Sequence, residues 1–324
     1  MSSTGASKLC QRAACPRRGR LGLAVAATFA LVAACASQPP ANHRTLGLRH
    51  AAAAEHAYKL GRYGAAAHNF NQALRHLRAA DDTVAVARLL HNHAVVLIAW
   101  KDCAAASGYL HEAAALNERQ TQPQQRALNL LALAGCQRKG GDQAAAGKSL
   151  TLAADLATKA GNKATAARAH AGLGAMKSGA GDLAGAAVAY AEAERLATSA
   201  AEPGALALVR NNQGRLLARR GSHGAAEKRF AQAADGYRRA GESDGMAQAL
   251  ANRATSLQAL GDKRGVEAAI LFQRAGHAAV TVARYASAAS WFASAAALFA
   301  ANGQVELAEQ CRSHGRKVLD ASAR

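Results

Sequence analysis

Residues 211–234 read NNQGRLLARRGSHGAAEKRFAQAA, and this stretch has the form of two helices joined by a tight turn. Gly221 can take the left-handed conformation that ends a first helix, and the side chain of Ser222 can cap the amides of a second helix. The apolar positions of the second segment are Ala226, Phe230 and Ala233. Spacings of four and three residues place them on one helix face. The stretch therefore predicts a helix–turn–helix unit with one apolar face.

The same unit recurs every 40 residues along the chain. The turn positions are Gly61, Lys101, Gly141, Gly181, Gly221 and Gly261. The small positions five residues later are Ala66, Ala106, Ala146, Ala186, Ala226 and Val266. The large apolar positions nine residues after each turn are Phe70, Leu110, Leu150, Tyr190, Phe230 and Ile270. Alanine or glycine lies seven residues before each turn, so the two helices of a unit can pack closely. Six copies at constant spacing predict an array of stacked units.

These positions resemble the tetratricopeptide repeat (TPR), which has small residues at positions 8, 20 and 27, glycine at 15 and a large residue at 24. Residues 171–193, AGLGAMKSGAGDLAGAAVAYAEA, are a second clear copy. The resemblance covers about Leu46 to Leu319. It implies an all-α, right-handed superhelical solenoid of about seven helix–turn–helix repeats over residues 46–320. The usual TPR spacing is about 34 residues, so the longer period implies helices about one turn longer.

Two registers are open at the C-terminal end. Constant spacing predicts a seventh pair hinged near Gly303, whereas a second match to the motif places a hinge near Ala283. The residues of that second match are Gly276, Tyr285, Ala288, Phe292 and Ala295. Both registers predict helices near 265–282, 285–300 and 303–319, and they differ in which helices pair. The last helix is polar, as expected for a terminal cap.

The composition fits an all-α array and a basic surface. Half of the 324 residues are apolar, aromatic residues make up only 4%, and there are five prolines. Small side chains favour thin layers of closely packed helices over one wide core. The formal net charge of +19 favours anionic partners such as acidic proteins or lipid headgroups. Arginine bias with solvated faces is the alternative.

The N-terminal segment has the form of an export signal. Residues 16–35 read PRRGRLGLAVAATFALVAAC, a basic stretch followed by an apolar run. The run is shorter than the roughly 20 residues that span a bilayer and has the length of a signal-peptide core. Its end, Val-Ala-Ala-Cys, resembles the lipobox of bacterial lipoproteins. An ordinary secretory peptide cleaved near Ala34 is the alternative.

The lipobox resemblance implies a location for the mature protein. Residues 1–34 would be removed, Cys35 would be lipidated, and residues 35–45 would form a short polar tether. Two or three acyl chains anchor a protein durably in a membrane. Ala36 follows the cysteine where an Asp would cause retention at the inner membrane. We therefore expect a lipid-anchored protein at the periplasmic face of the outer membrane.

The chain contains no recognisable catalytic motif. It has no nucleophile elbow, phosphate-binding glycine loop, H-E-x-x-H or C-x-x-C. His91 and His93 lie two residues apart and point to different sides of a helix, so they could not share a metal ion. We expect no enzymatic activity, cofactor or metal. Cys103 and Cys136 fall at packed positions; a disulfide between them is the alternative, and it would leave Cys311 unpaired.

A binding surface is the more informative candidate. In TPR proteins the first helices line a concave groove, where asparagine amides hydrogen-bond the backbone of extended ligands and basic residues hold acidic groups. The groove candidates carried over by position are Arg88, Asn92, Arg168, Asn211, Asn212, Arg215 and Asn252. Basic residues also cluster after Arg210. This predicted basic patch comprises Arg219, Arg220, Lys228, Arg229, Arg238 and Arg239.

Three hypotheses for function follow. The first is an envelope adaptor that binds protein partners during assembly of a pilus, secretion or outer-membrane complex, as several lipid-anchored TPR proteins do. The second is a receptor for extended peptides or protein tails in the groove. The third is electrostatic binding of an anionic envelope polymer through the basic patch. We expect no nucleic-acid partner, since the patch lacks adjacent stacking aromatics and the export signal argues against one.

Overall fold

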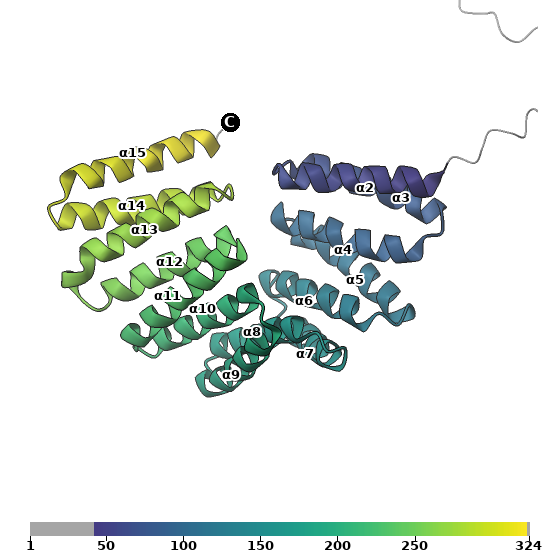
Figure 1. Ribbon diagram of the computed structural model, residues 1–324, viewed down its shortest axis with the longest axis horizontal. Coiled ribbons are helices and arrows are strands. Elements are labelled where there is room, and N and C mark those ends of the chain that lie inside the picture. The colour runs from purple at the N-terminus through teal and green to yellow at the C-terminus, as the bar shows by residue number, and fades with distance from the viewer. Residues whose placement is uncertain (1–41, 323–324) are drawn as a thin grey trace, which may run out of the picture. The chain divides into compact units, whose positions relative to one another are not determined.

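Helices of 16 to 18 residues alternate with tight joints along residues 42–322, the part of the chain that the computed structural model describes (Figure 1). Taken two at a time along the chain, the helices in first position are α2 (His43–Lys59), α4 (Thr83–Ala99), α6 (Pro123–Lys139), α8 (Lys163–Gly179), α10 (Pro203–Arg219), α12 (Ser243–Gln258) and α14 (Tyr285–Ala301). The second helices are α3 (Tyr63–Ala79), α5 (Cys103–Arg119), α7 (Gln143–Lys159), α9 (Leu183–Ala200), α11 (His223–Ala240), α13 (Gly265–Val280) and α15 (Val305–Ser322). These described residues confirm the predicted all-α, TPR-like solenoid with a period of about 40 residues.

Only the last residues of the predicted N-terminal region lie within the described part of the chain. The signal segment 1–34 and Cys35 lie outside the described residues. The tether was expected to run to Thr45, but α2 already begins at His43. Among residues 42–322, no helix combines the length and the apolar character needed to cross a membrane.

The joints recur at half the period of the sequence motif. One residue of positive φ occurs every 20 residues from 61 to 261: Gly61, Asp81, Lys101, Thr121, Gly141, Gly161, Gly181, Ala201, Gly221, Gly241 and Gly261. Lys101 has φ 67° at the place where the other hinges have glycine. The left-handed residue reverses the chain after each helix, so both the hinges within pairs and the links between pairs use the same local geometry.

Aspartates start several of the second helices, as predicted. Asp102, Asp142 and Asp182 accept hydrogen bonds from the backbone amides three residues later, at 3.0, 2.8 and 2.7 Å. These bonds satisfy amides that have no partner inside the helix. Ser222 makes no such side-chain bond, so the predicted cap at this joint is wrong.

The predicted apolar face forms the core of the first five pairs. The small residues five positions after each turn, from Ala66 to Ala226, are fully buried. The large residues from Phe70 to Phe230 are at most 5% exposed. Gly214 lies against the ring of Phe230, sixteen residues later, so closely that an added Cβ would be 2.7 Å from it. The sequence pattern therefore predicts the packing within these pairs correctly.

The sixth pair departs from the predicted register. Val266 and Ile270 were expected in the core, but they are 37% and 44% exposed. Ala268, Phe272 and Ala275 are buried instead, each two positions later. The 3-10 helix η1 (Asp262–Arg264) lies between α12 and α13, and the next left-handed residue after Gly261 is Ala283 rather than residue 281. Two extra residues in this region thus turn α13 relative to the motif.

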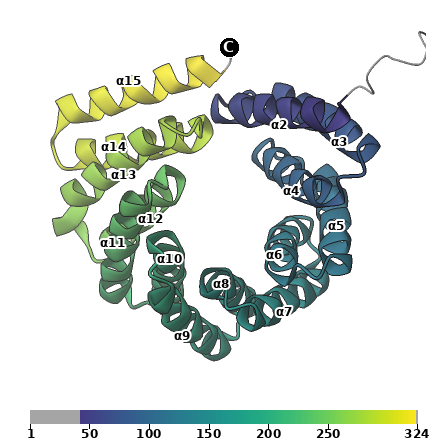
Figure 2. The ribbon, with the colours of Figure 1, turned by 45° about the vertical axis from the view of Figure 1, so that its right-hand side comes forward.

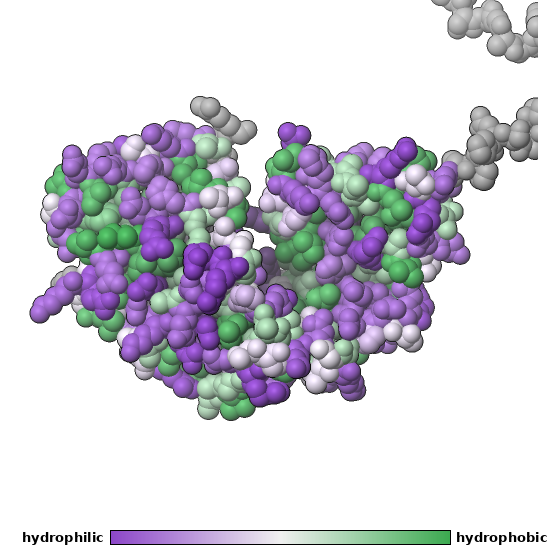
Figure 3. All heavy atoms as spheres, viewed as in Figure 1, coloured by the Kyte–Doolittle hydropathy of each residue, from purple (hydrophilic) through white to green (hydrophobic). Residues whose placement is uncertain are grey.

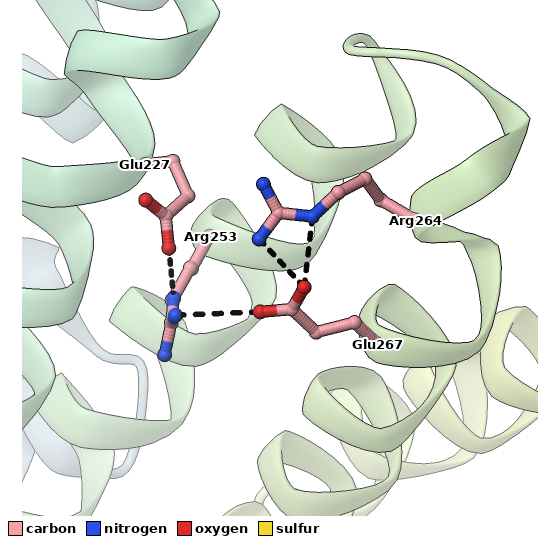
Figure 4. Close-up of polar contacts among 4 residues, drawn as sticks. All are labelled: Glu227, Arg253, Arg264 and Glu267. Atoms are coloured by element: carbon pink, nitrogen blue, oxygen red, sulfur yellow. Dashed lines mark hydrogen bonds and ion pairs between the residues drawn. The ribbon is translucent and has the colours of Figure 1, made fainter.

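An ion-pair network connects the helices around this irregular joint (Figure 4). Arg253 of α12 lies 2.6 Å from the carboxylate of Glu227 in α11 and 3.6 Å from that of Glu267 in α13. Arg264 of η1 contacts the same Glu267 at 2.6 Å. The network thereby links α11, α12, η1 and α13.

Packing at the C-terminal end follows the register hinged near Ala283. An added Cβ on Gly276 of α13 would lie 2.9 Å from the ring of Phe292 in α14, again sixteen residues later. This is the same contact that Gly214 makes inside the fifth pair. Under the other register, Ala296 would face residue 312, which is an exposed arginine. Thus α13 packs against α12 through one face and against α14 as a first helix does, while α15 covers α14.

Candidate functional site on the inner helices

The helices of each pair take inner and outer positions in the curved stack of residues 44–322. Helices α4, α6, α8, α10 and α12 lie on the inner side, and their second helices lie outside them (Figure 2). Each of these inner helices contacts the next one: α4 with α6, α6 with α8, α8 with α10, and α10 with α12. The space-filling view shows the hollow that the inner helices border (Figure 3). The predicted groove therefore exists as the inner side of the stack.

The candidate asparagines differ in how far they reach this surface. Asn92 of α4 and Asn252 of α12 are partly exposed. Asn211 and Asn212 of α10 are buried, with exposures of 7% and 9%, so their prediction as fully displayed groove residues is wrong. Asn211 lies where α10 meets the next inner helix, because its side chain contacts Asn252 of α12.

Two of these asparagines join adjacent inner helices. The amide of Asn252 donates to the side-chain oxygen of Asn211 at 3.1 Å, and Gln248 donates to the oxygen of Asn252 at 3.1 Å. A related contact joins α4 to α6, where a ring nitrogen of His91 lies 2.7 Å from the side-chain oxygen of Asn129. Amide and imidazole groups thus form polar contacts along the inner side of the stack.

Among the basic groove candidates, Arg168 pairs with an acidic residue, whereas Arg88 and Arg215 do not in the described part of the chain. Arg168 of α8 pairs with Glu202, the residue that precedes α10. Arg88 and Arg215 are exposed, and neither makes an ion pair or side-chain hydrogen bond within the described residues. Arg215 borders a cavity of about 580 Å³ together with Arg138 and Tyr190. The repeat motif predicts Tyr190 only as a core residue, because spacing along the chain does not show that a core side chain also borders a cavity.

The predicted basic patch is divided by acidic partners. Arg238 and Arg239 both contact Asp235, at 2.6 and 3.1 Å. Arg229 lies 2.9 Å from Glu194 of α9. Burial acts to raise the pKa of Glu194, but hydrogen bonds from Gln213 and Arg229 and the nearby positive charge hold it below its ordinary value.

Of the remaining patch residues, Arg219 and Arg220 donate to oxygens of neighbouring helices and Lys228 is exposed. Arg220 donates to the carbonyl oxygen of Leu183, and Arg219 donates to Ser178. Lys228 is exposed on α11. The six residues therefore do not form one continuous unpaired surface.

His93 and the described cysteines lie within the helix packing. His93 is 1% exposed and lies between the rings of Phe70 and Tyr109. Residues 42–322 contain no group of three potential metal ligands. Cys136 and Cys311 are buried and Cys103 is partly buried, as the packing interpretation predicts.

Together the hinges, the buried faces and the inner helices define a TPR-like helical repeat protein. No protein-family model matches the chain, and no curated protein matches it at a significant level. Solved structures do resemble it. The apo form of RapI has a TM-score of 0.61 and 12% identity, and the match covers 85% of this chain and 97% of RapI.

Two further structures share the fold. A Rap protein complexed with competence and sporulation factor has a TM-score of 0.61 and 13% identity, over 85% of this chain and 75% of that one. BtubC from P. vanneervenii has a TM-score of 0.55 and 18% identity, over 69% of this chain and 91% of that one. Likeness at these identities establishes the fold of the chain and not its activity.

Proposed function

We propose that this protein is a binding scaffold that holds an extended segment of a partner protein on its inner helices. The observation that carries the proposal is the set of polar side chains with unused donors on that side. Asn92 and Arg88 of α4 and Arg215 of α10 have no hydrogen-bond partner within residues 42–322, and Asn252 retains a second amide N–H. Such groups can bond a peptide backbone or an acidic side chain without specifying the whole ligand sequence.

The structural neighbours support this kind of ligand. The Rap protein was solved with competence and sporulation factor, and the Rap conjugation gene regulator of the plasmid pLS20 was solved with the Phr* peptide. The latter has a TM-score of 0.58 and 12% identity, over 85% of this chain and 74% of that one. A fold shared with peptide-bound proteins makes a peptide-like segment a reasonable ligand class here.

We further propose that the scaffold acts in a bacterial envelope, anchored through Cys35. This part rests on the export signal and the lipobox-like sequence. The corresponding role is an adaptor in assembly of a pilus, secretion or outer-membrane complex at the periplasmic face of the outer membrane. Metabolic labelling with a fatty acid tests the anchor. The wild-type chain should incorporate label and Cys35→Ser should not; equal labelling would contradict lipidation at Cys35.

Affinity capture tests binding on the inner side. The detergent-solubilised full-length chain, Asn92→Ala/Asn252→Ala, and a control with Gln72→Ala/Gln232→Ala on the outer helices α3 and α11 are compared as baits against solubilised envelope. A partner retained by the wild type and the control but lost from the inner double variant supports the proposal. A partner retained equally by all three, or none retained by the wild type, contradicts it.

A further inference from the structure

Three arginines from two separate pairs of the stack border one cavity. Arg138 lies at the end of α6, whereas Arg215 and Arg219 lie on α10, and all three line the cavity of about 580 Å³. Met176 of α8 and Tyr190 of α9 contribute to its wall from the intervening pair, and Gln143 of α7 also lines it. Helices α6, α8 and α10 are successive inner helices (Figure 2), and the cavity lies at their C-terminal ends, where Arg138, Gly179 and Arg219 line it.

The positive charge in this cavity is uncompensated. No acidic side chain of the described residues lines it. Arg138 and Arg215 make no ion pair or hydrogen bond within residues 42–322. Elsewhere in the stack, exposed arginines such as Arg238 and Arg316 have carboxylate partners. Since like charges that share a site repel one another, an anion would relieve this repulsion.

The third arginine and the tyrosine are held in place. Arg219 donates to the backbone oxygen of Ser178 and, at 2.9 Å, to its hydroxyl. The ring of Tyr190 is fixed against Gly174, where an added Cβ would lie 2.7 Å away. Tyr190 is 3% exposed, and burial raises its pKa, while the charges of Arg215, Arg219 and Arg138 act against that rise. The phenol therefore stays protonated and can donate a hydrogen bond beside the three guanidinium groups.

We propose that this cavity binds a dianionic phosphate monoester through Arg138, Arg215, Arg219 and the hydroxyl of Tyr190. Guanidinium groups match phosphate oxygens in a bidentate geometry, and charge-assisted bonds of this kind are strong. A single carboxylate would neutralise one of the three positive charges, whereas a phosphate monoester neutralises two and offers three terminal oxygens. The ligand is either a free phosphate monoester or one carried by a segment on the inner helices. In the second case the site gives the proposed scaffold a preference for phosphorylated partners.

Calorimetric titration of the full-length chain with phenyl phosphate tests the site, with benzoate as the singly charged analogue of similar shape. At physiological ionic strength we expect phenyl phosphate to bind with a Kd of about 1 mM or tighter and at least about tenfold more tightly than benzoate. Equal affinity for benzoate, or no binding of phenyl phosphate, would overturn the proposal.

Variants separate the cavity from general attraction to a basic protein. Arg215→Gln and Arg138→Gln should each weaken phenyl phosphate binding about tenfold or more, and Tyr190→Phe should weaken it less while keeping the ring. Arg238→Gln removes the same charge outside the cavity and should leave binding unchanged. A loss with Arg238→Gln equal to that with Arg215→Gln would overturn the assignment.

A phosphoserine peptide distinguishes the two ligand sources. Tighter binding of the peptide than of phenyl phosphate, with a loss upon Asn252→Ala, supports a segment-borne phosphate. Equal binding supports a free phosphate monoester. If phenyl phosphate binds but no partner is captured, the cavity assignment is supported and the scaffold proposal is contradicted. If a partner is captured but phenyl phosphate does not bind, the scaffold proposal is supported and the cavity assignment is contradicted.

Discussion

The thiol sulfur of Cys136 in α6 lies 2.8 Å from the thiol sulfur of Cys103 in α5, although 33 residues separate the two cysteines. Burial and then the hydrogen bond to Cys103 raise the pKa of Cys136 to about 12. The short distance between the two sulfurs places the pair for disulfide formation. The raised pKa keeps the Cys136 thiol protonated, so the partly exposed Cys103 is the thiol that an oxidant meets first.

Mild oxidation should join these two cysteines. Closing a loop of this length stabilises a protein by about 3–4 kcal/mol at most, because it restricts the unfolded chain. Peptide mapping by mass spectrometry should show Cys103 bonded to Cys136 and Cys311 still reduced. Cys103→Ser serves as the control, and its midpoint of urea unfolding should not respond to the oxidant. A wild-type chain that keeps both thiols under oxidation would refute this prediction.

Acid should destabilise the second pair through His93. Its ring is buried without a hydrogen-bond partner for Nδ1 within the described residues, and burial lowers its pKa to about 4. The unfolded chain takes up this proton near pH 6.5 and the folded chain only near pH 4, so stability falls as the pH drops through that window. The loss from this one group amounts to about 3 kcal/mol.

Chemical unfolding at a series of pH values measures this effect. His93→Leu should reduce the loss of stability between pH 6.5 and 4, whereas His68→Gln, an exposed position on α3, should not. Part of the slope will remain, since burial also lowers the pKa values of His91 and His277. An unchanged slope in His93→Leu would show that His93 is not the group responsible.

The glycines that face aromatic rings should resist substitution, unlike exposed helical glycines. Gly214→Ala gains about 1 kcal/mol in helix propensity but forces a Cβ against Phe230, and overpacking costs about 1–3 kcal/mol. Gly108 of α5 is exposed and has nothing near its Cβ position. Urea unfolding should show Gly108→Ala stabilised by up to about 1 kcal/mol and Gly214→Ala destabilised. Restoration of stability by Phe230→Leu in the Gly214→Ala background would confirm that the clash with Phe230 causes the loss. Equal changes in stability in Gly108→Ala and Gly214→Ala would exclude this clash as the cause.

The ion-pair network at the hinge of the sixth pair should contribute measurable stability through Arg253. Its side chain is 26% exposed and bridges two carboxylates, so Arg253→Gln removes two contacts at once. We expect a loss of about 1 kcal/mol, decreasing at high salt. Arg312→Gln, in an exposed pair with Glu309, is the matched control and should change little. Equal losses in the two variants would show that the network adds nothing beyond a surface ion pair.

The sequence predicts correctly those features of the fold that depend on residues close together along the chain. The pair Gly141 and Asp142 predicts a hinge, and the pair Ala226 and Phe230 predicts a buried face. Both features can be predicted because helix ends and helix faces are determined within a few residues. The two-residue shift before Phe272 cannot be predicted in this way, because the sequence of Asp262–Arg264 does not distinguish a 3-10 turn from the start of an α-helix. The hydrogen bond between Asn211 and Asn252 and the pairing of Arg168 with Glu202 also escape it. Their separations of 41 and 34 residues reflect which side chains can reach across adjacent helices.

The twenty-residue spacing of the left-handed joints has a consequence for how the chain folds. Helices of residues 42–322 contact the next helix along the chain, and several inner helices contact the next inner one, so packing in the described part is local in sequence. Ordering can therefore start at any hairpin and spread like a zipper, with the end helices fraying first. A destabilising change in the middle, such as one at Gly174, would then divide one cooperative transition into two.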